Sequence, residues 1–204
     1  MLLTQTLFRL LAAAIASAAT MAWAAREGHA TLVLAVAILF GIGLVTVALQ
    51  TNRYWRRPEL QGQDVFDISR AAKGNAGLMA VSYLWGGLSM LAIYLLADVS
   101  WRHGWQYGSG MVLIAALIFA GSAGRRPLSA AGIRMATALA LAQLVGSVAG
   151  LSFLVVSGKL MTGKGDWAAN YIFLTGGLTL VALTMIALRT QIRSVRRHPS
   201  GHTP

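Results

Sequence analysis

Six stretches of mostly apolar residues follow one another along the chain, separated by shorter polar segments. They lie near residues 5–24, 30–50, 77–97, 105–123, 129–157 and 168–188. A bilayer core of about 30 Å requires about 20 apolar residues per helix at a rise of about 1.5 Å per residue. The pattern therefore predicts an all-α polytopic membrane protein, in which residues 1–190 form a compact bundle of about six transmembrane helices.

The composition supports a lipid environment and excludes a soluble domain. Of the 204 residues, 56% are hydrophobic and only 11% are charged, whereas globular chains average about 45–50% apolar and about 25% charged residues. The chain contains no cysteine. Disulfides, thiolate metal sites and cysteine nucleophiles are therefore excluded.

The basic residues predict how the chain is threaded. Lys and Arg number 17 against 6 acidic residues, and most of them lie between the apolar stretches, with no nucleic-acid-binding motif. Of these 17 basic residues, only Arg26, Arg102, Lys159 and Lys164 fall on one side of the predicted bundle, and the others fall on the opposite side. The positive-inside rule then places both termini in the cytoplasm and the basic loops against anionic lipid. We expect a multi-pass protein of the bacterial cytoplasmic (inner) membrane that binds no nucleic acid.

The first apolar stretch has a second interpretation as a secretory signal. Arg9 precedes an apolar run that ends in Ala22-Trp23-Ala24, which fits an A-x-A cleavage pattern. Cleavage of residues 1–24 would leave five spans in the same orientation.

Two polar segments lie on the predicted cytoplasmic side. The loop over residues 51–75 contains a predicted helix over 63–73, with Asp64 as its N-cap and Gly74 as its end. This helix is either a docking surface or gate, or an amphipathic helix held at the interface by anionic lipid. The basic tail over 191–204 is expected to be disordered.

A weak internal similarity relates the third and sixth stretches. Residues 83–89 align with 173–179 at an offset of 90 positions, and each segment contains one Gly-Gly-Leu motif, at Gly86-Gly87-Leu88 and at Gly176-Gly177-Leu178. Because these stretches cross in opposite directions, the match suggests a 3+3 inverted repeat, as in many secondary transporters.

The fifth stretch carries a face of small and polar side chains. Gln143, Gly146, Ser147 and Gly150 recur at steps of three and four residues. Small residues let helix backbones approach closely, within the bundle or against a membrane-protein partner or second copy, and an amide can hydrogen-bond across the contact. The alternative is the wall of a solute path with Gln143 as its polar contact.

Candidate ligand-binding residues lie in the helices and in the predicted outer loops. Tyr hydroxyls within a span need partners, because lipid provides none. Polar and aromatic side chains at the outer loops fit the mouth of a small-molecule cleft. The candidate set is Gln143, Ser147, Tyr83, Tyr94, Asp98, Arg102, Trp105 and Asp166.

Two histidines, His29 and His103, fall on the predicted outer face. Together with a carboxylate they fit a Zn, Cu or Fe site, or as a pair the axial positions of a haem. No HExxH motif or fixed spacing accompanies them, and an interfacial histidine is the simpler interpretation. Neither a divalent metal nor haem is favoured as a cofactor.

The spans lack features that several mechanisms require. No Asp, Glu, Lys or His occupies the middle of a predicted span, which disfavours proton coupling through a deep carboxylate. No GxSxG, P-loop or dinucleotide motif is present, and we assign no catalytic residue. Three hypotheses remain: a small permease-like transporter of a neutral or amphipathic solute, a non-catalytic membrane subunit or scaffold, and a haem- or metal-dependent membrane oxidoreductase.

Overall fold

The computed structural model describes residues 2–54, 64–96, 104–122, 129–157 and 167–197. Over these residues the chain is helical and contains no strand. The helices are α1 (Leu2–Arg26), α2 (Ala30–Tyr54), α3 (Asp64–Leu96), α4 (Gly104–Ser122), α5 (Ala130–Val156) and α6 (Trp167–Arg197). All six are long and apolar enough to span a membrane, which confirms the predicted class and the predicted number of spans.

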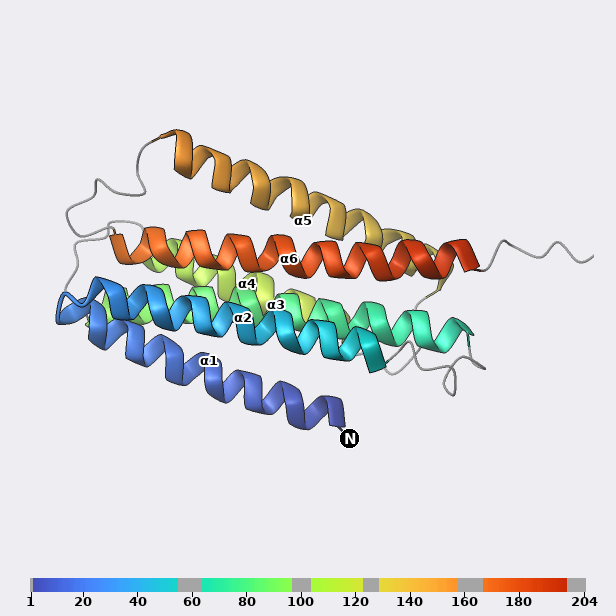
Figure 1. Ribbon diagram of the computed structural model, residues 1–204, viewed down its shortest axis with the longest axis horizontal. Coiled ribbons are helices and arrows are strands. Elements are labelled where there is room, and N and C mark those ends of the chain that lie inside the picture. The colour runs from blue at the N-terminus through green and yellow to red at the C-terminus, as the bar shows by residue number, and fades with distance from the viewer. Residues whose placement is uncertain (1, 55–63, 97–103, 123–128, 158–166, 198–204) are drawn as a thin grey trace, which may run out of the picture.

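The helices run up and down along the long axis of the bundle. α1, α3 and α5 run in one direction, and α2, α4 and α6 return (Figure 1). The start of α1 and the end of α6 therefore lie toward the same end of the bundle, which we call the terminal end. The opposite end, where α1 turns into α2, is called the far end.

Helix α3 forms the centre of the bundle. It packs against α1, α4 and α6 and more lightly against α2. Trp85 on α3 is 1% exposed, its ring stacks on that of Phe40 at a centroid distance of 4.9 Å, and its Nε1 donates to Ser17 Oγ at 2.9 Å. This one side chain thus joins α3 to both α1 and α2.

A pair of glycines brings α3 and α4 into close contact. A Cβ atom added to Gly87 would lie 2.7 Å from the carbonyl oxygen of Gly108, and one added to Gly108 would lie 3.0 Å from the carbonyl oxygen of Gly87. Backbone atoms cannot move aside as a flexible side chain can. The absence of side chains at both positions therefore permits this helix contact.

The turn between α1 and α2 follows from a single glycine. Gly28 has φ +75°, a left-handed conformation in which a side chain is disfavoured. The amide of His29 donates to Ala24 O at 2.8 Å and that of Gly28 to Ala25 O at 3.2 Å, which is the hydrogen-bond pattern of a Schellman motif. The motif ends α1 and places His29 at the far end.

Two helix boundaries differ from those expected. α3 starts at Asp64 and continues through Gly74, where a helix end was expected, so the polar connection is shorter than residues 51–75. Ala71, Ala72 and Asn75 are buried, and this buried face continues the helix into the bundle. α6 extends to Arg197, so the first residues of the expected disordered tail are helical.

The remaining expectations about threading stay predictions. They are the orientation of the termini in the membrane and the 3+3 inverted repeat. Ala22 and Ala24 of the possible cleavage pattern are fully buried within α1, so this helix contributes to the core of the bundle.

Candidate functional site: a cleft between α5 and the rest of the bundle

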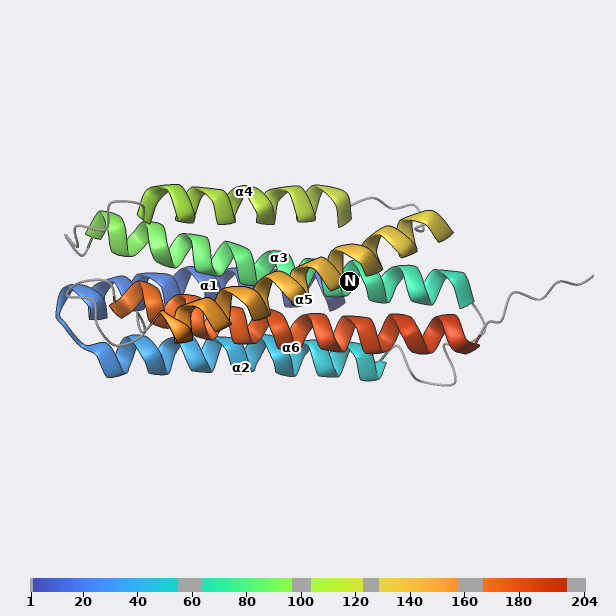
Figure 2. The ribbon, with the colours of Figure 1, turned by 90° about the horizontal axis from the view of Figure 1, so that it is seen from above.

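Helix α5 is the least buried part of the bundle. It packs along α6 and touches α3 at a few positions, and it makes no extended contact with α4 over the described residues. Figures 1 and 2 show α5 crossing the other helices obliquely, and in the view of Figure 1 it rises away from α6 toward the far end. Leu139, Val145 and Phe153 are each more than 60% exposed. α5 therefore contacts α6 and α3 along one side and leaves much of its surface exposed.

The divergence of α5 leaves a cleft of about 830 Å³ between α5 and the helices α3, α4 and α6. Small-molecule sites commonly have volumes of about 300–1,000 Å³. The walls are mostly apolar, and the lining residues, all described, carry no charge. They are Ser82, Tyr83, Gly86, Tyr107, Met111, Leu139, Ala142, Gln143, Gly146, Ser147, Gly150, Leu151, Phe153, Leu154, Ala169, Asn170, Ile172, Phe173, Gly176, Gly177 and Leu180.

Three of the candidate residues form a hydrogen-bonded chain in this cleft. The Tyr83 hydroxyl on α3 donates to Gln143 Oε1 on α5, and Gln143 Nε2 donates to Ser147 Oγ at 2.7 Å. Gln143 lies at the middle of α5, between Ala130 and Val156. These three hydrogen-bonded residues therefore place polar atoms at mid-height in a mostly apolar cleft and connect α5 to α3.

Ser82, also in the cleft, has a buried hydroxyl without a partner. The residue is 3% exposed, and its Oγ makes no hydrogen bond to any described residue. Buried hydroxyls elsewhere in the bundle bond to their own helix, as Ser89 Oγ does to Trp85 O at 2.7 Å and Thr184 Oγ1 to Leu180 O at 2.8 Å. A buried donor without an acceptor costs about 1–3 kcal/mol, so Ser82 has an unused hydrogen-bonding capacity.

The glycines of the cleft fall into two groups. A Cβ added to Gly146 or Gly150 would meet no atom of a described residue within 4 Å. On the facing helices, a Cβ would come within 3.2 Å of Met111 at Gly86 and within 2.9 Å of Leu151 at Gly177. The close helix contact expected at Gly146 and Gly150 is not made within the described part of the chain, and both residues line the cleft instead.

The other candidate residues lie apart from the cleft or outside the described residues. Asp98, Arg102, His103 and Asp166 belong to the latter group. Tyr94 and Trp105 are 37% and 51% exposed, and neither lines the cleft.

The structure adds no third ligand, among the described residues, to the hypothetical metal or haem site at His29 and His103. His29 is exposed, and its ring lies 6.0 Å from that of Trp23. The described residues contain no group of three or more His, Cys, Asp or Glu side chains that could hold a metal ion. Because His103 is outside the described residues, the histidine pair stays a prediction.

Sequence reasoning missed the contribution of α4 to the cleft. Tyr107 and Met111, one helical turn apart, line it, and the Tyr107 ring packs edge-on to Phe173 of α6 at 6.0 Å. The signal was the spacing of Gly104 and Gly108, both buried. Small residues at this spacing predict a close helix contact, and that contact fixes which face of α4 turns toward the cleft.

Polar contacts hold the bundle together toward the terminal end. Thr137 Oγ1 on α5 donates to Gln191 Oε1 on α6 at 2.9 Å. Asn52 Nδ2 on α2 donates to Asn75 Oδ1 on α3 at 3.3 Å, and Thr190 Oγ1 donates to Asn52 Oδ1 at 3.1 Å. Since Thr137 lies half a turn beyond the last cleft residue of α5 on this side, the cleft ends where these contacts begin.

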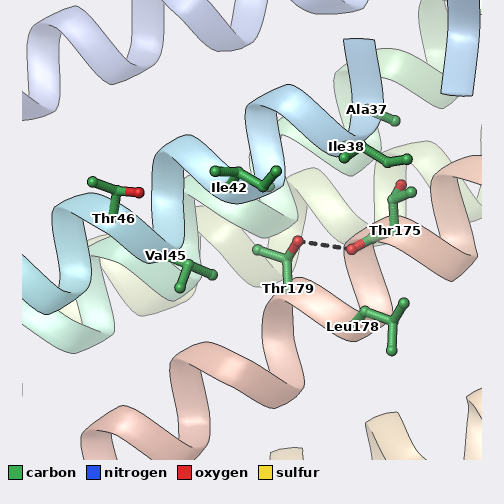
Figure 3. A pocket seen from close by; sticks show the side chains of 9 residues that line it. Ala37, Ile38, Ile42, Val45, Thr46, Thr175, Leu178 and Thr179 are labelled. Carbon is green, nitrogen blue, oxygen red and sulfur yellow. Dashed lines mark hydrogen bonds between the residues drawn. The ribbon is translucent and has the colours of Figure 1, made fainter. Parts of the chain in front are cut away.

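A second, shallower groove of about 290 Å³ lies between α2 and α6 (Figure 3). Its two threonines use their hydroxyls within α6: Thr179 Oγ1 donates to Thr175 O, and Thr175 Oγ1 donates to Tyr171 O, each at 2.7 Å. Ala37, Ile38 and other apolar side chains complete the groove. This groove offers an apolar surface suited to lipid chains, whereas the larger cleft has unused polar atoms.

Comparisons with known proteins identify no relative. No family model matches the chain, and no curated protein or solved structure is significantly similar to it. Since many unrelated functions occur on helical bundles, function is argued from the cleft itself.

Proposed function

We propose that this protein binds an uncharged or amphipathic small molecule in the cleft and carries it across the membrane, as a small permease-like transporter. The observation that carries the proposal is the cleft of about 830 Å³ with the Tyr83–Gln143–Ser147 chain at its middle. Mostly apolar walls with a few convergent polar groups are typical of small-molecule sites.

The chemistry of the walls favours an uncharged solute. A charged group in the bilayer interior is costly unless a partner of opposite charge or water accompanies it, and none of the lining residues is charged. Hydrogen bonds from an amide and from hydroxyls are sufficient to orient a neutral solute. The site therefore fits a carrier without a carboxylate for ion coupling.

The contacts of α5 suggest how the cleft could alternate between the two membrane faces. α5 is hydrogen-bonded to α6 at Thr137 and Gln191 and diverges toward the far end (Figure 1). We place the terminal end in the cytoplasm by the positive-inside rule, in the cytoplasmic membrane of a bacterium. The cleft then faces the outer half of the bilayer, and carriage requires α5 to separate from α6 at the terminal end.

A pair of glycine variants tests the proposal. Gly146→Leu adds a side chain where the cleft is open, and Gly43→Leu adds the same side chain to α2 at a position with no atom within 4 Å and outside both cavities. We expect neutral amphipaths that raise the melting temperature of the purified protein to lose this effect in Gly146→Leu only. Proteoliposomes then measure whether those compounds cross the membrane faster with wild type.

Three results would contradict the proposal. If no neutral compound stabilises the wild type more than Gly146→Leu, the cleft is not a binding site. If binding occurs but translocation equals that of empty vesicles, the protein binds without carrying. If Gly43→Leu loses the ligand-induced rise in melting temperature as fully as Gly146→Leu, the loss results from the added bulk and not from the cleft.

The exposure of α5 favours a second candidate, a non-catalytic membrane subunit or scaffold. Large apolar side chains are exposed along the helix, including Met135, Leu141, Val145 and Val156, and Gly146 and Gly150 leave room for close approach of another helix. Size measurement in detergent and quantitative co-purification would detect such a partner. Under this hypothesis Gly146→Leu would abolish association rather than ligand binding.

A further inference from the structure

We infer that the ligand of the cleft is a bilayer-dissolved molecule that carries an uncharged oxygen acceptor, such as an ester or ketone carbonyl, on an apolar chain. It reaches the cleft sideways from the lipid, between α4 and α5. This inference rests on the proposed binding function of the same cleft and adds the ligand class and its route.

The preference for an acceptor follows from the hydrogens that remain unused. In the Tyr83–Gln143–Ser147 chain, one amide hydrogen of Gln143 bonds to Ser147 Oγ, and Gln143 Oε1 already accepts from Tyr83. A primary amide has two donor hydrogens and a hydroxyl has one. The second Gln143 hydrogen and the hydroxyl hydrogens of Ser147 and Ser82 therefore have no acceptor among the described residues.

The position of these donors matches a carbonyl at mid-depth. Ser82 is next to Tyr83 on α3, and Ser147 is one turn after Gln143 on α5, and all four residues line the cleft. Ser82 Oγ is fully buried, and because a buried hydroxyl without a partner is costly, an acceptor oxygen that reaches it would remove that cost as well as form new bonds. A ligand offering only donors would leave it unchanged.

Apart from Tyr107 and Asn170, the rest of the lining fits an apolar chain. From Gln143 toward the far end, the cleft is lined by Leu151, Leu154 and Phe173, with Ile172 buried behind them. These side chains accept alkyl or isoprenoid segments and offer no ion partner. A headgroup with a permanent charge would have to lose its hydration without compensation.

The lateral route follows from the arrangement of α4 and α5. Both helices line the cleft, yet they make no extended contact over the described residues. Tyr107 of α4 and Phe153 of α5, one on each wall, are 52% and 68% exposed. Since both helices are long and apolar enough to span the membrane, the gap between them faces lipid, and a molecule dissolved in the bilayer can enter without passing through water.

Photolabelling in proteoliposomes tests the inference with four probes that share one diazirine-bearing sixteen-carbon chain. They end in a methyl ester, in no headgroup, in a trimethylammonium group, or in a sulfonate. Labelled peptides are located by mass spectrometry. We expect the ester to label α5 and α6 cleft residues several-fold more than the other three, and excess methyl palmitate to suppress this labelling.

Variants separate head recognition from chain binding. Gln143→Leu and Ser82→Ala should each lower ester labelling about fivefold, the size expected for one hydrogen bond, and leave labelling by the headless chain unchanged. Ser82→Ala removes no existing bond, so it keeps the test valid if Gln143→Leu does not fold. Gly146→Leu should abolish labelling by both probes, and Gly43→Leu should match wild type.

The outcomes distinguish this inference from the proposed function. Equal labelling by ester and headless chain, or stronger labelling by a charged probe, would overturn the inference while the cleft remains a binding site. If no probe labels the cleft but a water-soluble neutral solute stabilises wild type and not Gly146→Leu, the inference falls and the proposed function stands. If neither probes nor solutes distinguish Gly146→Leu from wild type, both fall.

Discussion

Helices α3 and α5 carry similar patterns of small residues but meet different surroundings. α3 packs against α1, α4 and α6, and its Gly87 lies against the backbone of Gly108. On α5, a Cβ added to Gly146 or Gly150 would have no atom within 4 Å in the part of the chain that the structure describes. A face of small residues permits another helix to approach closely. The position of that second helix decides whether the face forms a helix contact or the wall of a cavity.

The difference has a physical basis in lipid. Because lipid tails are as apolar as leucine, helices are held together in a membrane by close packing and hydrogen bonds rather than by the hydrophobic effect. α3 has both, through Gly87 and through the Trp85–Ser17 bond of 2.9 Å. α5 has the Thr137–Gln191 bond, the Tyr83–Gln143 bond and the contact of Leu151 with Gly177, so its other side remains available.

The largest effect is expected for Gly87→Val. The new side chain would clash with Gly108 O and with Val112, whose Cγ2 lies 2.8 Å from the added Cβ position, so α3 and α4 must separate. Overpacking of this kind costs about 1–3 kcal/mol, measured as a lower melting temperature in detergent. Gly43→Val on the open side of α2 is the control, and equal stability of the two variants would show that the contact is unimportant.

A smaller loss is expected for Asn52→Ala. This buried side chain bonds to Asn75 and Thr190, and removing it leaves both partners with fewer bonds, at a cost of about 1–2 kcal/mol. Thr190→Val removes only one of these interactions and should cost less. Chemical unfolding of both variants measures the difference, and a larger loss for Thr190→Val would refute this ranking.

A double-mutant cycle measures the bond that joins α3 to α5. Tyr83→Phe, Gln143→Leu and the double variant should give a coupling energy of about 0.6 kcal/mol, the average for hydrogen bonds between membrane helices. Steric trapping or thermal unfolding in detergent provides the stabilities. Additive effects would show that Tyr83 and Gln143 act independently, despite their contact.

The smallest effect on stability is expected for Gly146→Leu. The added side chain enters open space, so we expect the free energy of unfolding to change by less than about 0.5 kcal/mol, as for surface substitutions. Ligand binding should nevertheless be lost. A melting temperature lowered as far as in Gly87→Val would mean that α5 is closely packed there and that the cleft is closed.

Much of the site could be predicted from residue type and spacing, and part could not. Tyr83, Gln143 and Ser147 were candidate ligand contacts because polar groups within a span need partners, and all three line the cleft. Gly146 and Gly150 were expected to pack closely against another helix, and they line the cleft instead. Tyr94 and Trp105 were equally reasonable by that criterion and lie elsewhere. Residue type alone does not tell which side of a helix has a neighbour.

The end of the predicted helix at Gly74 shows the same limit in the fold. Glycine often ends helices, because it adopts conformations other residues avoid. Around Gly74, however, the neighbouring residues Ala71, Ala72 and Asn75 are buried in the bundle. The packing of this face outweighs the tendency of glycine to end a helix. By contrast, Gly28 ends α1, where the chain leaves the bundle and must turn.

The sequence by itself determined the class of the protein, the number of spans and the uncharged character of their middle, because each helix satisfies its own backbone in lipid and bilayer thickness sets its length. The tertiary structure alone decided that α5 makes no extended contact with α4 over the described residues, that Ser82 Oγ has no hydrogen-bond partner among them, and that Gly146 lines a cleft. These features depend on the distance between helices, which the pattern along any single helix does not contain.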